Sequence, residues 1–160
     1  MTPKAKITPC LWFNFNAEEA VNYYMSIFKN AKVHNILRYG DENPALKGKV
    51  LMMSFEIEGQ QFQALNAGPQ FSFNEAISLS VDCVDQTEVD YLWDRLVEGG
   101  TPSQCSWLKD KFGLSWQIVP RRLAVLLNDP DPSKALRVME AMMNMTKIDV
   151  AKIEAAYNQK

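Results

Sequence analysis

The chain has 160 residues and a mass of 18.2 kDa, enough for one domain of ordinary size or for two half-size modules that share a core. Apolar residues make up 47% and charged residues 22% of the sequence, which is typical of globular proteins and excludes disordered, collagen-like and coiled-coil chains. The net charge is −2, and no stretch gathers Lys and Arg into the basic stripe that binds nucleic acid. We therefore expect a single domain, residues 1–160, without a nucleic-acid partner.

The cysteines indicate a reducing compartment. Cys10, Cys83 and Cys105 are odd in number and never form the close pairs that zinc sites and dithiol redox sites use. The first ten residues lack the apolar segment of a secretion signal, and no window approaches the ~18 uninterrupted apolar residues of a membrane span. We expect a cytoplasmic protein with reduced thiols and no membrane partner.

The first half of the chain has the pattern of one strand, one helix and three further strands. Leu11 and Phe13 alternate with less apolar residues, which is the period of a half-buried strand. Apolar residues then recur every three or four positions, which predicts an amphipathic helix with Asn16 as its N-cap. The predicted elements are a strand at 6–15, a helix at 17–29 and strands at about 32–39, 49–58 and 61–67.

The second half repeats the beginning of this pattern, with a strand at 76–83, a helix at 86–98 and two strands within 104–120. Sliding the chain along itself by 68 residues places Leu11 on Leu79 and Phe28 on Leu96, which indicates an internal repeat. The identities are few, and any two amphipathic strand-helix units share some of them. We nevertheless predict an α+β fold with two βαβββ modules, at about 6–67 and 76–120.

A helical tail is predicted for residues 121–158. A short helix at 121–127 is broken by the sequence NDPDP, in which Asp131 and Pro132 provide an N-cap and a proline at the first helical position. Thr146, with Asp149 three residues later, is expected to open the last helix. Four methionines between Met139 and Met145 are expected to pack in the core or at a subunit interface.

Common catalytic motifs are absent. His34 is the sole histidine, so the chain has no paired histidine ligands and little scope for a nucleophile-histidine pair. It lies in a predicted strand, and we expect a structural or surface role for it rather than a catalytic one. The sequence also has no glycine-rich loop for a dinucleotide or a phosphate, and Gly99 and Gly100 are expected to end a helix.

Several segments resemble the PhnB-like proteins of the glyoxalase/bleomycin-resistance superfamily, the vicinal oxygen chelate proteins. The resemblance rests on PCLWFN, NAEEAV, AISLSVDC, the block KDKFGLSWQIVP and the tail MEAMM and MTKIDVAKIE, and it extends over nearly the whole chain. It implies paired βαβββ modules that form a cup-shaped mixed sheet, C-terminal helices and assembly as a homodimer. The family is often labelled 3-demethylubiquinone-9 3-methyltransferase-like.

The resemblance also allows the metal positions of the superfamily's glyoxalases to be compared with this chain. The histidine that opens their fifth strand corresponds to Ala76, and the glutamate of their last strand corresponds to Gln117. The first-strand ligand corresponds to Thr8 or Pro9, and the remaining one to a position within 63–66. Because these residues offer neither imidazole nor carboxylate, we expect no metal site and no cofactor.

The concave side of the cup is the candidate ligand site. Pleat alternation places aromatic rings and neutral hydrogen-bonding groups on it, which suits a small, uncharged or aromatic ligand. Cys105 is a candidate nucleophile, but we expect it to be an inert thiol. The candidate residues are Cys10, Trp12, Asn14, Asn66, Ser78, Cys105, Trp107, Ser115 and Gln117.

These features favour a metal-free homodimer that binds a small molecule, with its modules paired either within one chain or between subunits. One alternative is an enzyme, either of the glyoxalase/dioxygenase type or the methyltransferase that the family label suggests. The glycine-rich loop of the common Rossmann methyl-donor fold is missing. Another alternative is a divergent metalloenzyme with His34 and Gln117 as ligands.

Overall fold

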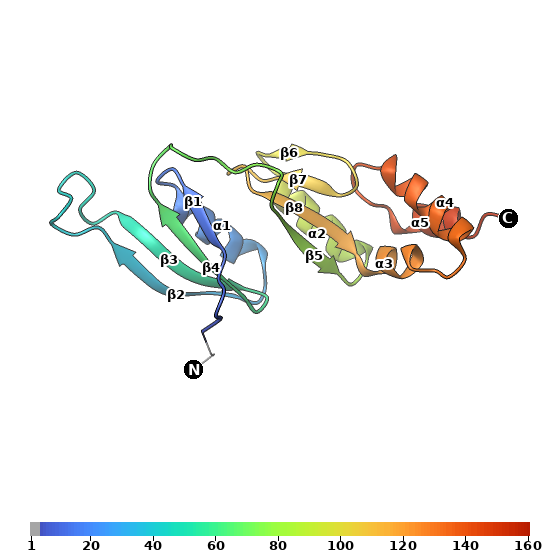
Figure 1. The fold of residues 1–160 in the computed structure, drawn as a ribbon, viewed down its shortest axis with the longest axis horizontal. Coiled ribbons are helices and arrows are strands. Elements are labelled where there is room, and N and C mark those ends of the chain that lie inside the picture. Colours follow the sequence, from blue (N-terminus) through green and yellow to red (C-terminus); the bar gives the residue numbers. More distant parts are fainter. Residues whose placement is uncertain (1–3) are drawn as a thin grey trace. The chain divides into compact units, whose positions relative to one another are not determined.

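The computed structural model describes residues 4–160, and the chain divides into two compact units between Phe73 and Asn74. Each unit contains a four-stranded mixed sheet and a helix that packs on it (Figure 1). Three further helices complete the second unit. No helix among residues 4–160 has the length and apolar character needed to cross a membrane.

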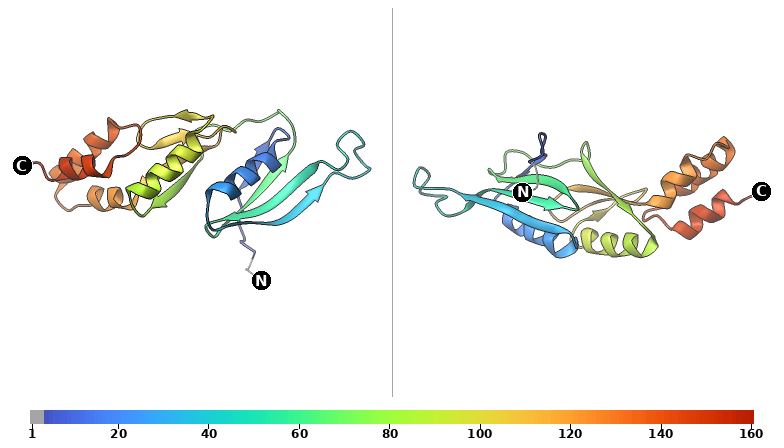
Figure 2. Two further views of the ribbon diagram at one scale, coloured as in Figure 1. Left: turned by 180° about the vertical axis from the view of Figure 1, so that it is seen from behind. Right: turned by 90° about the horizontal axis from the view of Figure 1, so that it is seen from below.

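The first unit is a βαβββ module. Its strands lie in the order β1-β4-β3-β2, with β1 parallel to β4 and the other pairs antiparallel. Helix α1 covers one face of this sheet (Figure 2), where Phe55 and Phe62 stack with 5.3 Å between their ring centroids. The elements are β1 (Cys10–Phe13), α1 (Ala17–Ile27), β2 (Ala31–Arg38), β3 (Val50–Ile57) and β4 (Gln60–Asn66).

Helix α1 begins where the sequence predicts, but a residue distant in sequence binds its first free N–H group. Asn16 is the N-cap residue, yet its side chain makes no capping hydrogen bond. Instead, the backbone N–H of Ala17 donates to Oδ1 of Asn66 at 2.9 Å. The amide of Asn66 also donates from Nδ2 to the carbonyl oxygen of Val50 at 3.0 Å. Asn66 therefore ties the start of α1 to the sheet.

The second unit repeats the module. Its strand order, β5-β8-β7-β6, is the same as in the first sheet, and β5 begins 68 residues after β1, at Ser78 and Cys10. The predicted α+β fold with two βαβββ modules is thus confirmed, and both sheets are open. The elements are β5 (Ser78–Cys83), α2 (Gln86–Val97), β6 (Thr101–Pro102), β7 (Trp107–Lys109) and β8 (Ser115–Pro120).

Two details of this unit differ from the expectation. Strand β6 has only two residues, too few to show any alternation in the sequence. Ile77, which lies within the strand predicted at 76–83, precedes β5 and is 73% exposed. The strand begins later than predicted because the alternating pattern extends beyond the residues that pair with β8.

A buried aspartate organises the KDKFGLSWQIVP block. Asp110 is 3% exposed; its Oδ1 accepts hydrogen bonds from the backbone N–H groups of Phe112 and Leu114, and its Oδ2 accepts one from the indole of Trp116. These bonds hold the turn between β7 and β8, where Gly113 has φ +87°. The turn therefore depends on one carboxylate that is fully engaged in hydrogen bonds.

The C-terminal helices are α3 (Arg121–Leu127), α4 (Pro132–Met143) and α5 (Val150–Tyr157). The predicted N-cap of α4 is confirmed, because Asp131 accepts from the backbone N–H of Ser133 at 2.9 Å. The prediction that Thr146 opens the last helix is wrong. Asp149 is itself the N-cap of α5 and accepts from the N–H of Lys152, since a carboxylate at this position caps the helix directly.

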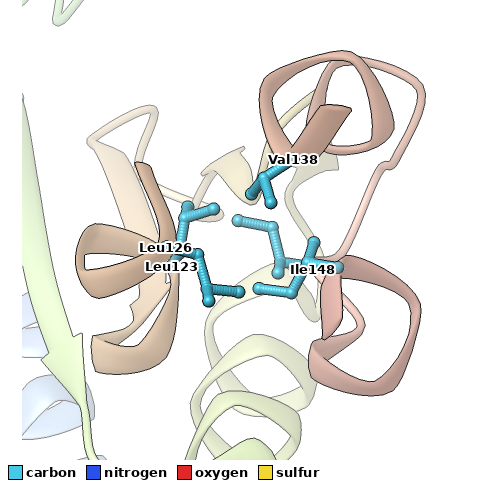
Figure 3. Packing of buried hydrophobic residues seen from close by; sticks show 5 residues of the cluster. Leu123, Leu126, Val138 and Ile148 are labelled. Carbon is cyan, nitrogen blue, oxygen red and sulfur yellow. The ribbon is translucent and has the colours of Figure 1, made fainter. Parts of the chain in front are cut away.

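These helices enclose a separate apolar cluster (Figure 3). Met142 and Met145 are half-buried against it, whereas Met139 and Met143 are exposed. The side chain of Gln86 connects the cluster to α2, since Nε2 donates to the Ile148 carbonyl and Oε1 accepts from the Val150 N–H. The cluster consists of Leu123, Leu126, Val138, Ile148 and Ile153.

Candidate functional site

The face of the first sheet that α1 leaves uncovered carries polar side chains. Cys10 and Ser54 are both paired with Gln63 across neighbouring strands, so these three residues point to the same side of the sheet. The buried side chains of Phe55 and Phe62 point to the opposite side. Alternation along the strands therefore separates an apolar, helix-covered face from an open one that is polar at Cys10, Ser54 and Gln63 and carries Trp12, Met52 and Leu65 further along.

A groove of about 550 Å³ lies in the first unit, which is a volume typical of small-molecule sites. The N-terminal segment contributes Lys4 and Thr8, and a hydrogen bond from the Ala5 N–H to Oε1 of Gln61 at 3.0 Å joins this segment to β4. The groove is lined by Lys4, Thr8, Lys32, His34, Asn35, Ser54, Phe55, Gln61, Phe62 and Gln63.

Three charged or titratable side chains meet beside this groove. Nε2 of His34 lies 3.0 Å from Oε2 of Glu56, and Nζ of Lys32 lies 3.9 Å from Oε1 of the same carboxylate. The side chain of Glu56 is only 10% exposed, whereas that of Lys32 is 54% exposed. The buried carboxylate thus has two partners on β2, and the lysine remains open to solvent.

Three of the predicted site residues lie at or just after β1 in the first unit. Cys10 is exposed, and the half-buried Trp12 donates from its indole nitrogen to the Gly68 carbonyl at 2.9 Å. The Trp12 ring also packs edge-on against Phe71, with 4.9 Å between centroids. Asn14 follows the strand and is exposed. None of the three lines the groove.

Asn66 differs from the other candidates. It is 3% exposed and pairs with Phe13, which lies on the helix-covered side of the sheet. Both ends of its amide are engaged, by Ala17 and by Val50. We therefore assign Asn66 a structural role. The register of β4 against β1 places Asn66 on the helix-covered side, and a shift by one residue would turn its side chain to the open side.

In the second unit, several candidates share one side of the sheet. Ser78 pairs with Ser115, and Trp107 pairs with Gln117. Nε2 of Gln117 donates to Oγ of Ser78 at 2.9 Å. Oγ of Ser115 is buried and has no hydrogen-bond partner among residues 4–160. Ser78 and Gln117 are half-buried and Ser115 lies beneath them, so this side of the sheet is polar and neutral, and what it binds stays a prediction.

Cys105 lies in the loop between β6 and β7. It and Ser106 have positive φ angles of 58° and 62°, a conformation that non-glycine residues adopt at a cost. Their backbone N–H groups donate to the carbonyls of Met145 and Thr146. The strained pair therefore holds the segment that leads into α5, and the half-buried Cys105 lies at this junction.

The titration of two thiols argues against nucleophilic roles for them. Burial raises the pKa of the Cys10 thiol above its ordinary value. Burial raises the pKa of Cys83 to about 12, and the neighbouring carboxylates of Glu88, Asp82 and Asp85 act in the same direction. Because the thiolate is the reactive form, Cys83 is a poor nucleophile at neutral pH, and Cys10 carries less thiolate than an ordinary cysteine.

The residues at the superfamily's metal positions do not fit a metal ion. The positions that the resemblance assigns to the metal ligands are Thr8 or Pro9, a residue within 63–66, Ala76 and Gln117, and none of these residues has an imidazole or a carboxylate. Among residues 4–160, no group of three or more His, Cys, Asp or Glu side chains is placed to hold a metal. His34 and Glu56 bind one another, and their further neighbour Lys32 is a cation.

Sequence reasoning missed Lys32, Glu56 and Gln61 as site residues. Lys32 and Glu56 are directly paired across β2 and β3, but that pairing joins residues 24 positions apart and depends on an irregular register. A lysine and a glutamate in predicted strands are ordinary surface residues by pattern alone. Only the pairing of β2 with β3 places both beside His34.

Comparison with known proteins identifies the family. A family model described as 3-demethylubiquinone-9 3-methyltransferase matches residues 5–119. A solved PhnB protein from Bacillus cereus, which bears the same methyltransferase name, is 34% identical over 71% of this chain and 97% of its own, with a TM-score of 0.65. None of the curated proteins matches the chain.

Two further solved structures are similar to this chain at lower identity. A protein from Pseudomonas aeruginosa is 23% identical over 71% of this chain and 95% of its own, with a TM-score of 0.61, which supports the fold. A glyoxalase/bleomycin resistance protein from Albidiferax ferrireducens is 11% identical over 68% of this chain and 92% of its own, with a TM-score of 0.46.

Helices α3 to α5 follow the region that the family model covers, which ends at residue 119. That region includes both βαβββ modules and nearly all of their strands. The chain therefore belongs to the PhnB-like 3-demethylubiquinone-9 3-methyltransferase family.

Proposed function

We propose that the protein binds a small molecule in the groove of its first unit, that it does so without a metal ion, and that it acts as a homodimer. The observation that carries the proposal is the groove itself, with a volume of about 550 Å³ and a lining of two lysines, one histidine and neutral polar groups. Lysine ammonium groups and side-chain amides all donate hydrogen bonds. A ligand that carries oxygen acceptors suits this lining.

The charges of the lining residues indicate the charge of the ligand. No Asp or Glu is among its lining residues, and the one carboxylate beside it, Glu56, contacts Lys32 and His34. Two lysines thus face a single neighbouring carboxylate. We infer a small anionic ligand, such as a carboxylate, in place of the uncharged ligand that the sequence suggested.

The proposed homodimer is supported by the family resemblance and by exposed apolar side chains. On α4, Leu136, Met139 and Met143 are 57%, 40% and 62% exposed and recur at helical spacing along one side. Apolar side chains of this kind are often covered in an assembly.

Native mass spectrometry of protein purified without added metal, followed by elemental analysis, tests the proposal. We expect two chains per particle, no stoichiometric divalent ion and a co-purified organic anion. The Lys32→Met variant should retain about tenfold less of this anion, whereas Lys152→Met, which changes an exposed lysine on α5, should retain it fully. One tightly bound divalent ion per subunit would contradict the metal-free proposal.

A further inference from the structure

A β-bulge in β2 lies at His34, beside the groove. Across β2 and β3, Val33 pairs with Phe55 and Asn35 pairs with Ser54, so His34 is the extra residue with no direct partner. In a regular strand, His34 would pair with Ser54, and Asn35 would pair with Met53 and point to the side covered by α1. With the bulge, His34 and Asn35 both line the groove. Bulges of this kind re-aim side chains and are frequent beside active sites.

The buried carboxylate of Glu56 determines which nitrogen of His34 can act as a base. An ionised carboxylate only accepts hydrogen bonds, so Nε2 of His34, which is 3.0 Å from Oε2, carries the hydrogen. In the neutral imidazole, Nδ1 is then left with a free electron pair. The His34 side chain is 35% exposed, whereas that of Glu56 is 10% exposed. A buried carboxylate that orients a half-open imidazole is the arrangement of a general base and its positioning group.

The other side chains that line the groove suit a reaction in which His34 removes a proton from the substrate. His34 supplies the imidazole among the lining residues. Lys4 and Lys32 supply positive charge, which stabilises an anionic group or a negative charge that develops during a reaction. Gln63 and Ser54 supply neutral hydrogen-bonding groups that can orient a substrate.

We propose that the groove carries out a proton transfer, with His34 as the general base and Glu56 as its positioning residue. The proposed substrate class is a small carboxylate that also carries a ketone, since the ketone acidifies the neighbouring C–H bond and the carboxylate suits the lysines. This inference rests on the proposed binding function. It adds a reaction to that function.

The proposed proton transfer needs no cofactor, because each bond that breaks is matched by one that forms. The C–H bond next to the ketone breaks, its proton moves to Nδ1 of His34, and its electron pair forms a C=C bond as the carbonyl electrons move onto oxygen. The negative charge of the resulting enolate is stabilised by the lysine ammonium groups. Return of the proton from Nδ1 to carbon restores the ketone and the neutral imidazole. In heavy water, the net result is exchange of hydrogen for deuterium.

Proton NMR in heavy water at neutral pH tests the reaction, with straight-chain 2-oxo acids of three to six carbons as probes. The full chain should accelerate loss of the C3 proton signal of at least one probe. The His34→Gln variant should lose about 100-fold or more of the catalysed rate, and Glu56→Gln about tenfold or more. The control Glu140→Gln, an exposed residue of α4, should keep the full rate. Equal exchange by the wild type and His34→Gln would overturn the proposal.

Two further measurements separate this proposal from the binding proposal and from misfolding. Calorimetric titration of each probe reports binding, so a probe that binds without exchange overturns only the reaction. The absence of binding for every probe overturns both the reaction and its substrate class. Nitrogen NMR of the sole imidazole should show hydrogen on Nε2 in the wild type, and hydrogen on Nδ1 would overturn the assignment of the base. Circular dichroism melting curves confirm that each variant is folded.

Discussion

Asn66 shows how one side chain can determine the position of a helix. Its amide accepts from the Ala17 N–H and donates to the Val50 carbonyl, at 2.9 and 3.0 Å, in a site that is 3% exposed. The sequence signal for the start of α1 was Asn16, which is adjacent in the chain. The residue that binds the free N–H group is 49 positions away, and no local pattern indicates it.

We expect Asn66→Ala to lower the free energy of unfolding by about 2 kcal/mol, because two buried hydrogen bonds are lost and their partners are left unsatisfied. Urea unfolding followed by tryptophan fluorescence measures the change. Asn14→Ala, at an exposed position, should change it by about 0.5 kcal/mol or less. Equal effects of the two variants would contradict the structural role of Asn66.

Cys83 should be the least reactive of the three cysteines. Its pKa is raised to about 12, first by burial and then by nearby carboxylates, so only about one molecule in ten thousand carries the thiolate at pH 8. Alkylation of the native protein by iodoacetamide, mapped by mass spectrometry, should modify the exposed Cys10 well before Cys83. The rate at Cys83 should rise about tenfold per pH unit above pH 8. Rapid modification of Cys83 at pH 8 would refute its burial.

At the scale of elements, the sequence predicts the regular parts of the fold well. Helices α1 and α2 and strands β1 and β4 have clear periodicity, because each buries one face against a partner. The bulge in β2 and the two-residue strand β6 leave no such signal. The groove leaves no such signal either, because it depends on the pairing of β2, β3 and β4 and not on any single segment.

Gln86 should be important for docking the C-terminal helices. Its side chain binds the Ile148 carbonyl and the Val150 N–H at 3.1 and 2.7 Å. We expect Gln86→Ala to destabilise the protein by about 1–2 kcal/mol and to speed amide hydrogen exchange in residues 145–157. Gln70→Ala, an exposed position in the first unit, is the matched control. Unchanged exchange in residues 145–157 would show that other contacts hold these helices.

Gly100 should be required for the close approach between the end of α2 and β7. A Cβ atom there would lie 2.0 Å from the Lys109 carbonyl oxygen and 2.8 Å from the carbonyl carbon of Asp110. We expect Gly100→Ala to cost about 3 kcal/mol or more, because backbone atoms have to move. Gly59→Ala, with φ +83° and open space around it, should cost only about 1 kcal/mol of backbone strain. Thermal melting of both variants compares the two costs.

At the scale of the whole molecule, the repeat gives the chain two sheets with the same strand order but different polar faces. The first carries Lys32, His34 and Glu56 beside a groove, whereas the second carries Ser78, Ser115 and Gln117. Because the first face brings an imidazole and a lysine to a buried carboxylate, we expect the chemistry of this chain to come from that face.

Sedimentation velocity should give a particle of twice the 18.2 kDa chain mass if the protein is a homodimer. Replacing the exposed Leu136 and Met143 on α4 with glutamate should weaken a dimer that buries them, since charges there lose their hydration. The same replacements at Ala151 and Ala155, which are exposed on α5, are the control. A particle of one chain mass in the wild type would refute the proposed dimer.

The most direct test of the central claim is a titration of nitrogen-labelled protein with 2-oxobutanoate, or with any anion that co-purifies, followed by amide NMR. If the groove is the binding site, the shifts should concentrate at Thr8, Lys32, His34 and Gln63 and should saturate. The Lys32→Met variant should require a higher concentration to saturate them. Saturable shifts confined to Ser78, Ser115 and Gln117 would contradict the account, because they would place the ligand on the second sheet.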